Sequence, residues 1–337
     1  MIPKPDKIAV IGAGSWGTAL AVLLGGKGKD VWLWGHDPGH MNLLAKKRCN
    51  PLDLQKVSFP DTLQVSDNLE KTLINASCIV MVVPSHAFRD VFKQVVKILK
   101  KRTLIVSATK GIEIESRMTM SQIMAEMTQD SSHFLGALSG PSFAIEVATK
   151  QPTAVTVAFA DEKAARIIQQ LFATDYFRTY SSTDVIGLEL CGAIKNIIAI
   201  AAGISDGLGY GLNTRAALIT RGLAEMSRMG LAMGADPATF AGLGGLGDLV
   251  LTCTGNLSRN RTVGLKLGSG KKLNQALAEM NNVAEGIKTT KSCYILARSL
   301  NVDMPILDQV YQVLYKDKPC TQAVSELFSR DLKKESE

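Results

Sequence analysis

The sequence lacks several patterns that would place it in a specialised class of protein. Its six cysteines (Cys49, Cys78, Cys191, Cys253, Cys293, Cys320) show no CxxC pairing, and four lie in apolar runs, which favours buried free thiols in a reducing compartment. The four histidines show no metal-ligand spacing, because Pro38 separates His36 from His40 and argues against a shared helical face. We therefore expect neither a disulfide framework nor a metal centre.

Long hydrophobic runs are also missing. The longest apolar stretch, IIAIAAGI, is too short to span a bilayer. The first apolar run reads as a strand rather than a signal peptide, so we expect a cytoplasmic protein without membrane insertion. Lysine and arginine are scattered and do not alternate with aromatic residues, so nucleic acid is not an expected partner. The net charge of +7 suits small anionic molecules, although general solubility explains it equally well.

A glycine-rich segment near the start, IAVIGAGSWG, lies between a β-branched run and the helix-forming sequence TALAVLL. This context favours a dinucleotide site over a plain strand–turn–helix. Gly12 permits the tight turn, Gly14 lets the backbone approach a pyrophosphate, and Gly17 lets the helix pack closely on the strand. The amides of Ser15 and Trp16 would then point at the phosphates, helped by the helix dipole.

A second match to the same spacing occurs in AGLGGLGD, at Gly242, Gly244 and Gly247. No strand-like run precedes it, so the strand half of the motif is missing. We interpret this segment as a glycine-rich turn.

The chain of 337 residues is long enough for two domains. Strand-like runs alternate with helix-like segments, which predicts an α/β fold with a parallel, doubly wound sheet. These runs are KIAVIG, DVWLWG, LQV, CIVMVV, TLIVSA and FLGAL, extended by TAVTVAF and residues 177–180. From about Asp184 the sequence becomes rich in Ala, Leu, Met and Gly, and SSTD offers a helix N-cap. We predict a dinucleotide-binding domain over 1–183, an all-helical domain over 184–330 and a tail over 331–337.

Ligands of such sheets bind beyond the carboxyl ends of the strands, which points to residues 84–86, 108–111 and 139–142. We interpret His86 as a loop or capping residue. Lys110 is a candidate because it follows a buried strand and precedes a glycine, although a surface lysine is the alternative. Pro141 can occupy the first turn of a helix and leave nearby amides free for ligand.

The end of the second strand bears on the choice of dinucleotide. An acidic residue that binds the ribose 2′-hydroxyl is typical of NAD sites. Asp37 lies twenty positions after Gly17, but it is two residues late for this role. Gly35 and His36 leave room for a 2′-phosphate, so we expect NADP(H) to be accepted alongside NAD(H), with a slight preference for NADPH.

The segment GLELCGAIKNIIAIAAG carries the main catalytic candidate, Lys195. At helical spacing its neighbours are all small or apolar, namely Cys191, Gly192, Ile198 and Ala199. A buried ammonium needs a partner or a lowered pKa, unless the side chain reaches out to water. A lysine with a lowered pKa is a suitable proton donor to a carbonyl under reduction. Asn196 can donate to a substrate oxygen or to local backbone.

Further along, Asp248 and Thr252 are four apart and share a face if a helix begins there. Asp248 is either a simple N-cap or the partner that orients Lys195. Arg259 and Asn260 follow on what we expect to be a polar loop, and the guanidinium fork of arginine matches phosphate oxygens.

These segments together resemble the bacterial NAD(P)-dependent glycerol-3-phosphate dehydrogenase family. The similarity covers GAGSWGTALA, the Lys110–Gly111 turn, SGPSFA, GAIKNIIAIAAGISDGLGYGLNTRAAL and GLGGLGDLVLTCTGNLSRNR. It implies a Rossmann domain followed by a helical domain of the 6-phosphogluconate dehydrogenase type. It also implies reversible reduction of dihydroxyacetone phosphate to sn-glycerol 3-phosphate, which feeds glycerophospholipid synthesis.

The resemblance implies roles for individual residues as well. Lys195 exchanges the proton, while Lys110 and Asp248 contact the substrate. Ser258, Arg259 and Asn260 line the region of the substrate phosphate and the cofactor. To these we add Gly140, Ser142, Asn196 and Thr252 as substrate-site candidates, from their places after the sixth strand and beside Lys195 and Asp248. The cofactor site includes Gly12, Gly14, Ser15, Trp16, Gly17, His36, Lys110, Ala144, Arg259, Val283 and Glu285. The family often has arginine where this chain has His36, which weakens the expected NADP preference.

Two other functions stay open at this point. A β-hydroxyacid dehydrogenase shares the architecture but needs a site for a substrate carboxylate. A dinucleotide sensor without turnover would leave Lys110, Lys195 and Asp248 without a shared task. The sequence does not fix the oligomeric state, and a homodimer is one option.

Overall fold

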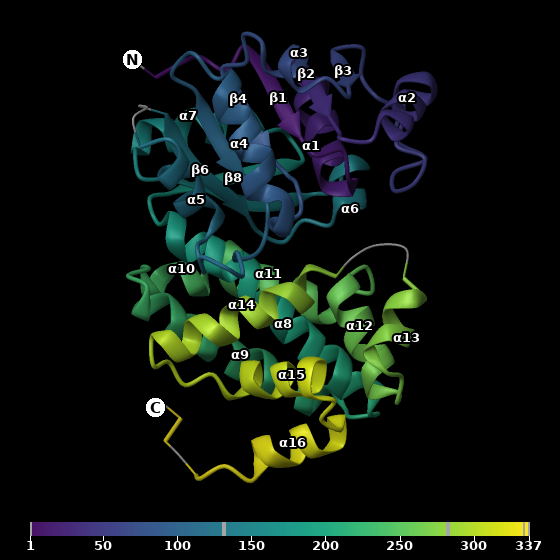
Figure 1. Cartoon of the computed structure of the whole chain (residues 1–337), viewed down its shortest axis with the longest axis vertical. Coiled ribbons are helices and arrows are strands. Elements are labelled where there is room, and N and C mark those ends of the chain that lie inside the picture. Colours follow the sequence, from purple (N-terminus) through teal and green to yellow (C-terminus); the bar gives the residue numbers. More distant parts are fainter. Residues whose placement is uncertain (1, 130–132, 281–283, 333, 336–337) are drawn as a thin grey trace.

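The computed structural model has an α/β part at the N-terminal end of the chain and a helical part that follows it (Figure 1). It describes residues 2–129, 133–280, 284–332 and 334–335. The two parts lie one above the other in Figure 1, with α8 (Val185–Gly207) running through the middle of the helical part. The predicted fold class, a Rossmann-type domain followed by a helical domain, is confirmed.

The α/β part is built on a single sheet of eight strands in the order β3-β2-β1-β4-β5-β6-β7-β8. The strands are β1 (Lys7–Ile11), β2 (Asp30–Trp34), β3 (Leu63–Ser66), β4 (Cys78–Met81), β5 (Leu104–Ser107), β6 (Phe134–Ser139), β7 (Thr153–Phe159) and β8 (Phe177–Ser182). Strand order reverses around β1, which is the switch point where doubly wound sheets bind dinucleotides. All eight predicted strand segments form strands.

The expectation of a purely parallel sheet is wrong at one position. Strand β7 pairs antiparallel with β6, and β8 then runs parallel to β7. The connection from β6 to β7 holds only the short helix α6 (Ala144–Ala148), whereas a parallel crossover needs a dozen or more residues. Chain length between the strands therefore explains the reversal, and the first six strands still end at one edge.

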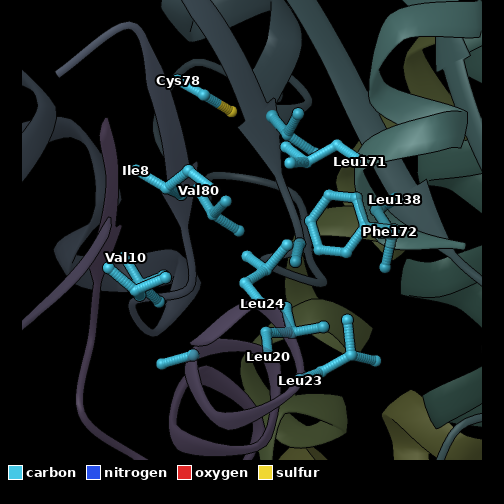
Figure 2. Packing of buried hydrophobic residues seen from close by; sticks show 14 of the residues in the cluster. Ile8, Val10, Leu20, Leu23, Leu24, Cys78, Val80, Leu138, Leu171 and Phe172 are labelled. Atoms are coloured by element: carbon cyan, nitrogen blue, oxygen red, sulfur yellow. The ribbon is translucent and has the colours of Figure 1, made fainter. Parts of the chain in front are cut away.

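Helices cover both faces of the sheet. Helices α1 (Ser15–Gly26), α2 (Pro38–Lys47) and α7 (Glu162–Phe172) contribute to one core cluster. Helices α3 (Leu69–Leu73), α4 (Phe88–Ile98) and α5 (Met120–Met127) contribute to the opposite one. Figure 2 shows the first cluster, in which Val80 of the sheet lies near Leu24 of α1 and Phe172 of α7. Because helices bury both faces of the sheet, the strands and the residues at their carboxyl ends are held in defined positions.

The glycine-rich turn between β1 and α1 has the tight geometry predicted for it. Gly12 has a φ of +125°, and a Cβ there would lie 2.5 Å from the carbonyl oxygen of Val82. A Cβ on Gly17 would lie 1.9 Å from the oxygen of Gly12. Only glycine at position 17 therefore allows the first turn of α1 to pack this closely against the turn after β1. Gly14 differs, because no atom lies within 4 Å of a Cβ placed there, and this side of the turn is open.

The helical part surrounds α8. Its other helices are α9 (Leu212–Ala232), α10 (Pro237–Ala241), α11 (Asp248–Thr254), α12 (Arg259–Gly268), α13 (Leu273–Ala278), α14 (Glu285–Ser299), α15 (Pro305–Lys316) and α16 (Cys320–Phe328). Asp184 caps α8 by accepting a hydrogen bond from the amide of Gly187 at 2.9 Å, which confirms the predicted cap. Among the described residues α8 is the one helix long and apolar enough to cross a membrane, but it is buried and forms the core of this part.

Glycines allow α8 and α12 to cross backbone against backbone. A Cβ on Gly203 would lie 2.1 Å from the carbonyl oxygen of Arg261, and one on Gly264 would lie 2.1 Å from that of Ile200. One turn further along, Gly207 and Gly268 are similarly confined. This close crossing fixes the start of α12 relative to the Lys195 segment.

Two smaller expectations concern the cysteines and the second glycine motif. All six cysteines are free, and Cys78, Cys191, Cys253 and Cys293 are buried, as predicted. The segment interpreted as a glycine-rich turn is a five-residue π-helix, Leu243–Gly247, which leads directly into α11. A Cβ on Gly245 would lie 2.1 Å from the oxygen of Phe240, so glycine allows this tight approach.

Candidate active site

Four polar side chains meet where the sheet faces the helical part. Lys110 and Ser139 follow or end strands β5 and β6, Lys195 lies in the middle of α8, and Asp248 is the first residue of α11. Asp248 accepts from Lys110 Nζ at 3.0 Å through Oδ2, and its Oδ1 pairs with Lys195 Nζ. Ser139 Oγ lies 3.4 Å from the same Oδ2. One carboxylate therefore bridges a lysine from each part of the chain.

The burial of this cluster distinguishes between the alternative interpretations of Lys195, Lys110 and Asp248 given by the sequence. The side chains of Lys195 and Asp248 are 7% and 1% exposed, so Lys195 does not reach out to water. Lys110 is partly buried with 22% exposure, and its ammonium is paired, unlike that of a free surface lysine. The N-cap interpretation of Asp248 is wrong, because Gly247 holds the N-cap position and the carboxylate is engaged with the two lysines. The pairing of Asp248 with Lys195 is confirmed.

Burial and charge shift the proton affinities of the cluster. Desolvation lowers the pKa of Lys195 to about 7; Asp248 opposes this shift and the neighbouring Lys110 adds to it. Burial alone would raise the pKa of Asp248, but the two ammonium groups together hold it below its usual value. The lowered pKa favours the anionic form of Asp248, while Lys195, with a pKa of about 7, can gain or lose a proton near neutral pH. That is the property required of a group that exchanges a proton with substrate.

Two glycines make room for the cluster. A Cβ on Gly192 of α8 would lie 3.1 Å from Ser139 Oγ and 3.6 Å from Cγ of Lys110, so this face of the helix lies close to the strand ends. Gly111, with a φ of +145°, allows the loop after β5 to pass Ser85, which a Cβ would approach to 2.7 Å. Both positions therefore set how closely Lys110 approaches α8.

A buried chain of amides connects this cluster with two further helices. Asn196 Nδ2 donates to the carbonyl of Gly192 at 3.3 Å, and its Oδ1 accepts from Asn260 Nδ2 at 2.8 Å. Asn260 in turn accepts from the amide of Gly286 at 2.9 Å. Thr252 donates to the backbone carbonyl of Asp248 at 2.6 Å. Asn196 therefore bonds the backbone and another side chain, while Thr252 braces the first turn of α11.

The expected polar loop at Arg259 and Asn260 is wrong, because both residues lie in the first turn of α12. Ser258 is the N-cap, and its Oγ accepts from the amide of Arg261 at 3.2 Å. The pattern S-R-N-R contained this capping signal, since serine is a preferred N-cap. Arg259 is exposed, whereas Asn260 and Ser258 are buried. The helix start and the exposed guanidinium together offer donors for an anion.

The glycine-rich turn has free capacity for a pyrophosphate. No side chain caps the start of α1, and its first turn contains no acidic residue that would compete with a phosphate. The indole Nε1 of Trp16 is buried without a hydrogen-bond partner, and the position of Gly14 is open. An unsatisfied donor beside an open backbone surface fits a dinucleotide, so the residues present suit the cofactor.

The end of β2 is the position that bears on the choice of dinucleotide. His36 is exposed and directly follows the strand and Gly35. Asp37 caps α2, where its Oδ1 accepts from the amides of Gly39 and His40 at 2.8 and 3.2 Å. Asp37 is therefore committed to the helix, which leaves His36 as the polar side chain next to the strand end.

The remaining predicted site residues fall into different places. Gly140 has a φ of +142°, and a Cβ placed there would lie 2.8 Å from Cα of Val155. Ser142 Oγ donates to the carbonyl of Gly140 at 2.8 Å. Pro141 does not begin a helix, since α6 starts at Ala144 with Phe143 as its N-cap, so that expectation is wrong. Glu285 begins α14, and its Oε2 accepts from Ser85 Oγ at 2.7 Å. Val283 lies outside the described residues.

Two site residues were not singled out from the sequence. Ser139 contacts Asp248, and Ser85 contacts Glu285, each across the boundary between the sheet and the helical part. Both serines lie in segments placed correctly at the carboxyl ends of strands. Position at the strand end was the available signal, but their partners are more than a hundred residues away in the sequence.

The doubly wound sheet, the free helix start at its switch point and the buried lysine–aspartate pair beside it define a dinucleotide-dependent oxidoreductase with two domains. Family models agree with this class: the C-terminal model of the NAD-dependent glycerol-3-phosphate dehydrogenases matches residues 184–325, and the N-terminal model matches residues 7–165. The chain belongs to the NAD-dependent glycerol-3-phosphate dehydrogenase family.

Individual relatives match over nearly the whole chain. Glycerol-3-phosphate dehydrogenase (NAD(P)+) of Desulfotalea psychrophila is 57% identical over 332 residues, covering 97% of this chain and 98% of the relative. The enzyme of the same description from Citrifermentans bemidjiense is 54% identical over 331 residues, covering 98% and 99%. A crystal structure of glycerol-3-phosphate dehydrogenase from Coxiella burnetii superposes with a TM-score of 0.93 at 41% identity, covering 97% of this chain and all of the other.

Proposed function

We propose that this protein catalyses the reversible NAD(P)H-dependent reduction of dihydroxyacetone phosphate to sn-glycerol 3-phosphate, a precursor of glycerophospholipids. The observation that carries the proposal is the buried Lys195, paired with Asp248 and placed beside Lys110 at the carboxyl edge of the sheet. Full-length similarity to glycerol-3-phosphate dehydrogenases supports the choice of substrate. A β-hydroxyacid substrate is disfavoured, since the exposed fork of Arg259 at a helix start suits a phosphate.

The residues of the cluster have distinct roles in this reaction. When bound, NAD(P)H supplies the hydride for the ketone carbon of the substrate. Lys195 donates its proton to the oxygen that becomes a hydroxyl, and Lys110 stabilises the negative charge that develops there. Asp248 holds both ammonium groups in place. In the reverse direction, neutral Lys195 accepts the proton from the hydroxyl.

A second group of side chains holds the substrate for this chemistry. Arg259 binds the phosphate together with the start of α12, so that the carbonyl stays within reach of the nicotinamide. Asn260 and Ser258 complete this end of the site. We assign Gly140, Ser142, Asn196 and Thr252 to the walls of the substrate site.

For the cofactor, we propose that the glycine-rich turn binds the pyrophosphate through Gly12, Gly14, Ser15, Trp16 and Gly17. His36 would lie next to the adenosine ribose, and a slight preference for NADPH follows because Asp37 is occupied in capping α2. Lys110, Ala144, Arg259, Val283 and Glu285 complete the proposed cofactor site. Initial rates with NADH and NADPH in parallel measure this preference.

A steady-state assay tests the function directly. We expect oxidation of NADPH or NADH in the presence of dihydroxyacetone phosphate, and no comparable rate with 2- or 3-keto acids. Faster turnover of a keto acid would support the β-hydroxyacid dehydrogenase alternative. Cofactor binding without turnover of either substrate class would support a sensor instead.

Replacing Arg259 by alanine is expected to raise the KM for dihydroxyacetone phosphate roughly 100-fold, because a charge-assisted hydrogen bond pair contributes about 2–3 kcal/mol. We expect kcat to fall as well, by a smaller factor than the rise in KM, because the same contact keeps the carbonyl in place for hydride transfer. Arg166→Ala is a matched control, as Arg166 is exposed on α7 and forms only a long pair with Glu162. An unchanged KM for Arg259→Ala would remove this residue from the phosphate site.

The pH dependence follows from the lowered pKa of Lys195, about 7. Reduction requires protonated Lys195, so its kcat should fall as pH rises through neutrality. Oxidation requires the neutral amine, so its kcat should rise over the same range. Measurement of kcat at saturating substrate removes the titration of the unbound substrate phosphate from the profile. Reduction that stays constant or accelerates with rising pH would contradict the role of Lys195.

Three further assignments complete the proposal. We place the domain boundary between residues 183 and 184, where the last strand gives way to α8, with residues 331–337 as a tail. The enzyme acts in the cytoplasm on a small phosphorylated substrate, without nucleic acid or membrane insertion. For the oligomeric state we propose a homodimer, which light scattering measures.

A further inference from the structure

A buried carboxylate on α8, separate from the Asp248 cluster, contacts the α/β part of the chain. Glu189 is 8% exposed, and its Oε1 accepts from the backbone amide of Ser121 at 2.9 Å. Its Oε2 accepts from Ser121 Oγ at 2.5 Å. Ser121 lies in the first turn of α5, directly after Met120, the first residue of that helix. A side chain of the helical domain therefore caps a helix of the dinucleotide-binding domain.

This contact is unusual because the carboxylate has no cationic partner. No salt bridge reaches Glu189 within the described part of the chain, and its bonds come from Ser121 and the neighbouring Thr119. Burial raises the pKa of Glu189, and these hydrogen bonds oppose the shift. A buried carboxyl group destabilises the fold unless its hydrogen bonds offset the free-energy cost of desolvation. Nothing in the proposed reaction uses Glu189 directly.

The position of Glu189 along α8 connects it with the catalytic cluster. Glu189, Gly192 and Lys195 follow one another at intervals of three residues, so they are successive neighbours on the helix surface. Glu189 contacts α5, Gly192 faces Ser139 and Lys110, and Lys195 reaches Asp248. At Gly192 the fit is close, since a Cβ there would be only 3.1 Å from Ser139 Oγ. Any shift of α8 along its axis would therefore change the distance of Lys195 from the sheet edge.

We propose that Glu189 is a positioning residue for the reaction: its double hydrogen bond to Ser121 fixes the height of α8 over the sheet edge and so places Lys195 opposite Lys110. This inference rests on the proposed function, because it assigns Glu189 a role through Lys195. It names no contact between Glu189 and substrate or cofactor. The hydrogen bonds join two domains, whereas an ordinary helix cap joins residues of the same domain.

The test compares two substitutions at one position. Glu189→Ala removes the bonds to Ser121 and Thr119 and should lower kcat for dihydroxyacetone phosphate reduction roughly 10- to 100-fold, as expected for a catalytic group displaced by about an ångström. The KM for NADPH should change less than about twofold, since the cofactor turn lies on another element. Glu189→Gln should stay within about threefold of wild type, because its oxygen can accept from the Ser121 amide and its NH₂ can donate to Ser121 Oγ.

A pH profile provides a readout that a purely structural role would not move. Lys195 is faced by Lys110 from the loop after β5 and by Asp248 from α11. If α8 shifts in Glu189→Ala, water reaches Lys195, and the fall of the reduction kcat should move to higher pH. Glu189→Gln should keep the wild-type profile.

Glu225 offers a matched control. It is also a buried glutamate that caps a helix, accepting from the amides of Ile306 and Leu307 at the start of α15 at 2.6 and 3.2 Å. This cap lies entirely within the helical domain. Glu225→Ala should lower the melting temperature but leave kcat and its pH profile unchanged. An equal fall of kcat in Glu225→Ala would overturn the proposal, since the effect would then be one of general stability.

Two outcomes separate this inference from the proposed function. A wild-type protein without turnover of dihydroxyacetone phosphate would remove the function. A wild-type enzyme that is active, with kcat and pH profile unchanged in folded Glu189→Ala, would remove only the inference. If Glu189→Ala does not fold, Ser121→Ala tests the proposal in its place. This variant removes one bond to Glu189 and should lower kcat about threefold, with the fall of the reduction kcat again moved to higher pH. An unchanged Ser121→Ala enzyme would then overturn the proposal.

Discussion

Replacing Lys195 by methionine is expected to lower kcat for dihydroxyacetone phosphate reduction by about 10³- to 10⁴-fold, at the upper end of what a general acid contributes. Methionine keeps the length and apolar stem of the side chain, so the packing of α8 should survive. The proton donor is lost, and Asp248 is left with Lys110 as its only cation in the cluster. The dissociation constant of NADPH, measured by fluorescence, should change little.

Lys27→Met is the control for losing a partly buried ammonium. Lys27 Nζ donates to the carbonyls of Gln170 and Leu171 at 2.8 Å each, at the end of α7 and outside the catalytic cluster. This substitution should reduce thermal stability and leave kcat near the wild-type value. A folded Lys195→Met enzyme with near-normal turnover would show that another group supplies the proton.

Replacing Gly264 by alanine is expected to lower the free energy of unfolding by about 3 kcal/mol or more, because the added methyl has no space. Its Cβ would lie 2.1 Å from the oxygen of Ile200 and 2.9 Å from Cα of Gly203, and backbone atoms cannot rotate away. Helices α8 and α12 would have to separate, which carries Arg259 away from Lys195. Calorimetry should show a melting temperature lower by roughly 6–12 °C.

Gly26→Ala is the same chemical change without the steric conflict. Gly26 is the last residue of α1, and no atom lies within 4 Å of a Cβ placed there. Alanine is the better helix former by about 0.5–1 kcal/mol, so this variant should be as stable as wild type or slightly more stable. Equal melting temperatures for Gly264→Ala and wild type would mean that the helices cross less closely than described.

The sequence predicted those parts of the site that depend on local patterns. The strand–glycine–helix order identified the dinucleotide turn, and the apolar surroundings of Lys195 predicted its burial, because both signals lie within one element. Position after a strand identified Lys110 for the same reason. Each of these predictions uses residues a few positions apart.

Predictions that depended on chain reversals or distant partners were weaker. The antiparallel β7 follows from the short connection through α6, which strand patterns alone do not reveal. The polar composition around Arg259 favours a loop, and the capping signal of Ser258 that begins α12 is a single residue against it. The bonds of Ser139, Ser85 and Ser121 join segments that only the tertiary fold brings together. Pairing between remote carboxylates and hydroxyls has no periodicity that a sequence could show.

The bridging position of Asp248 has a consequence for exchanging parts between related enzymes. Its two lysine partners are encoded on opposite sides of the domain junction: Lys110 precedes it, whereas Lys195 and Asp248 itself follow it. Hybrid proteins joined at the junction would inherit one lysine from each parent. They would be active only where the two parents place these lysines in the same positions relative to Asp248. Recombination at this point therefore preserves folding more readily than it preserves turnover.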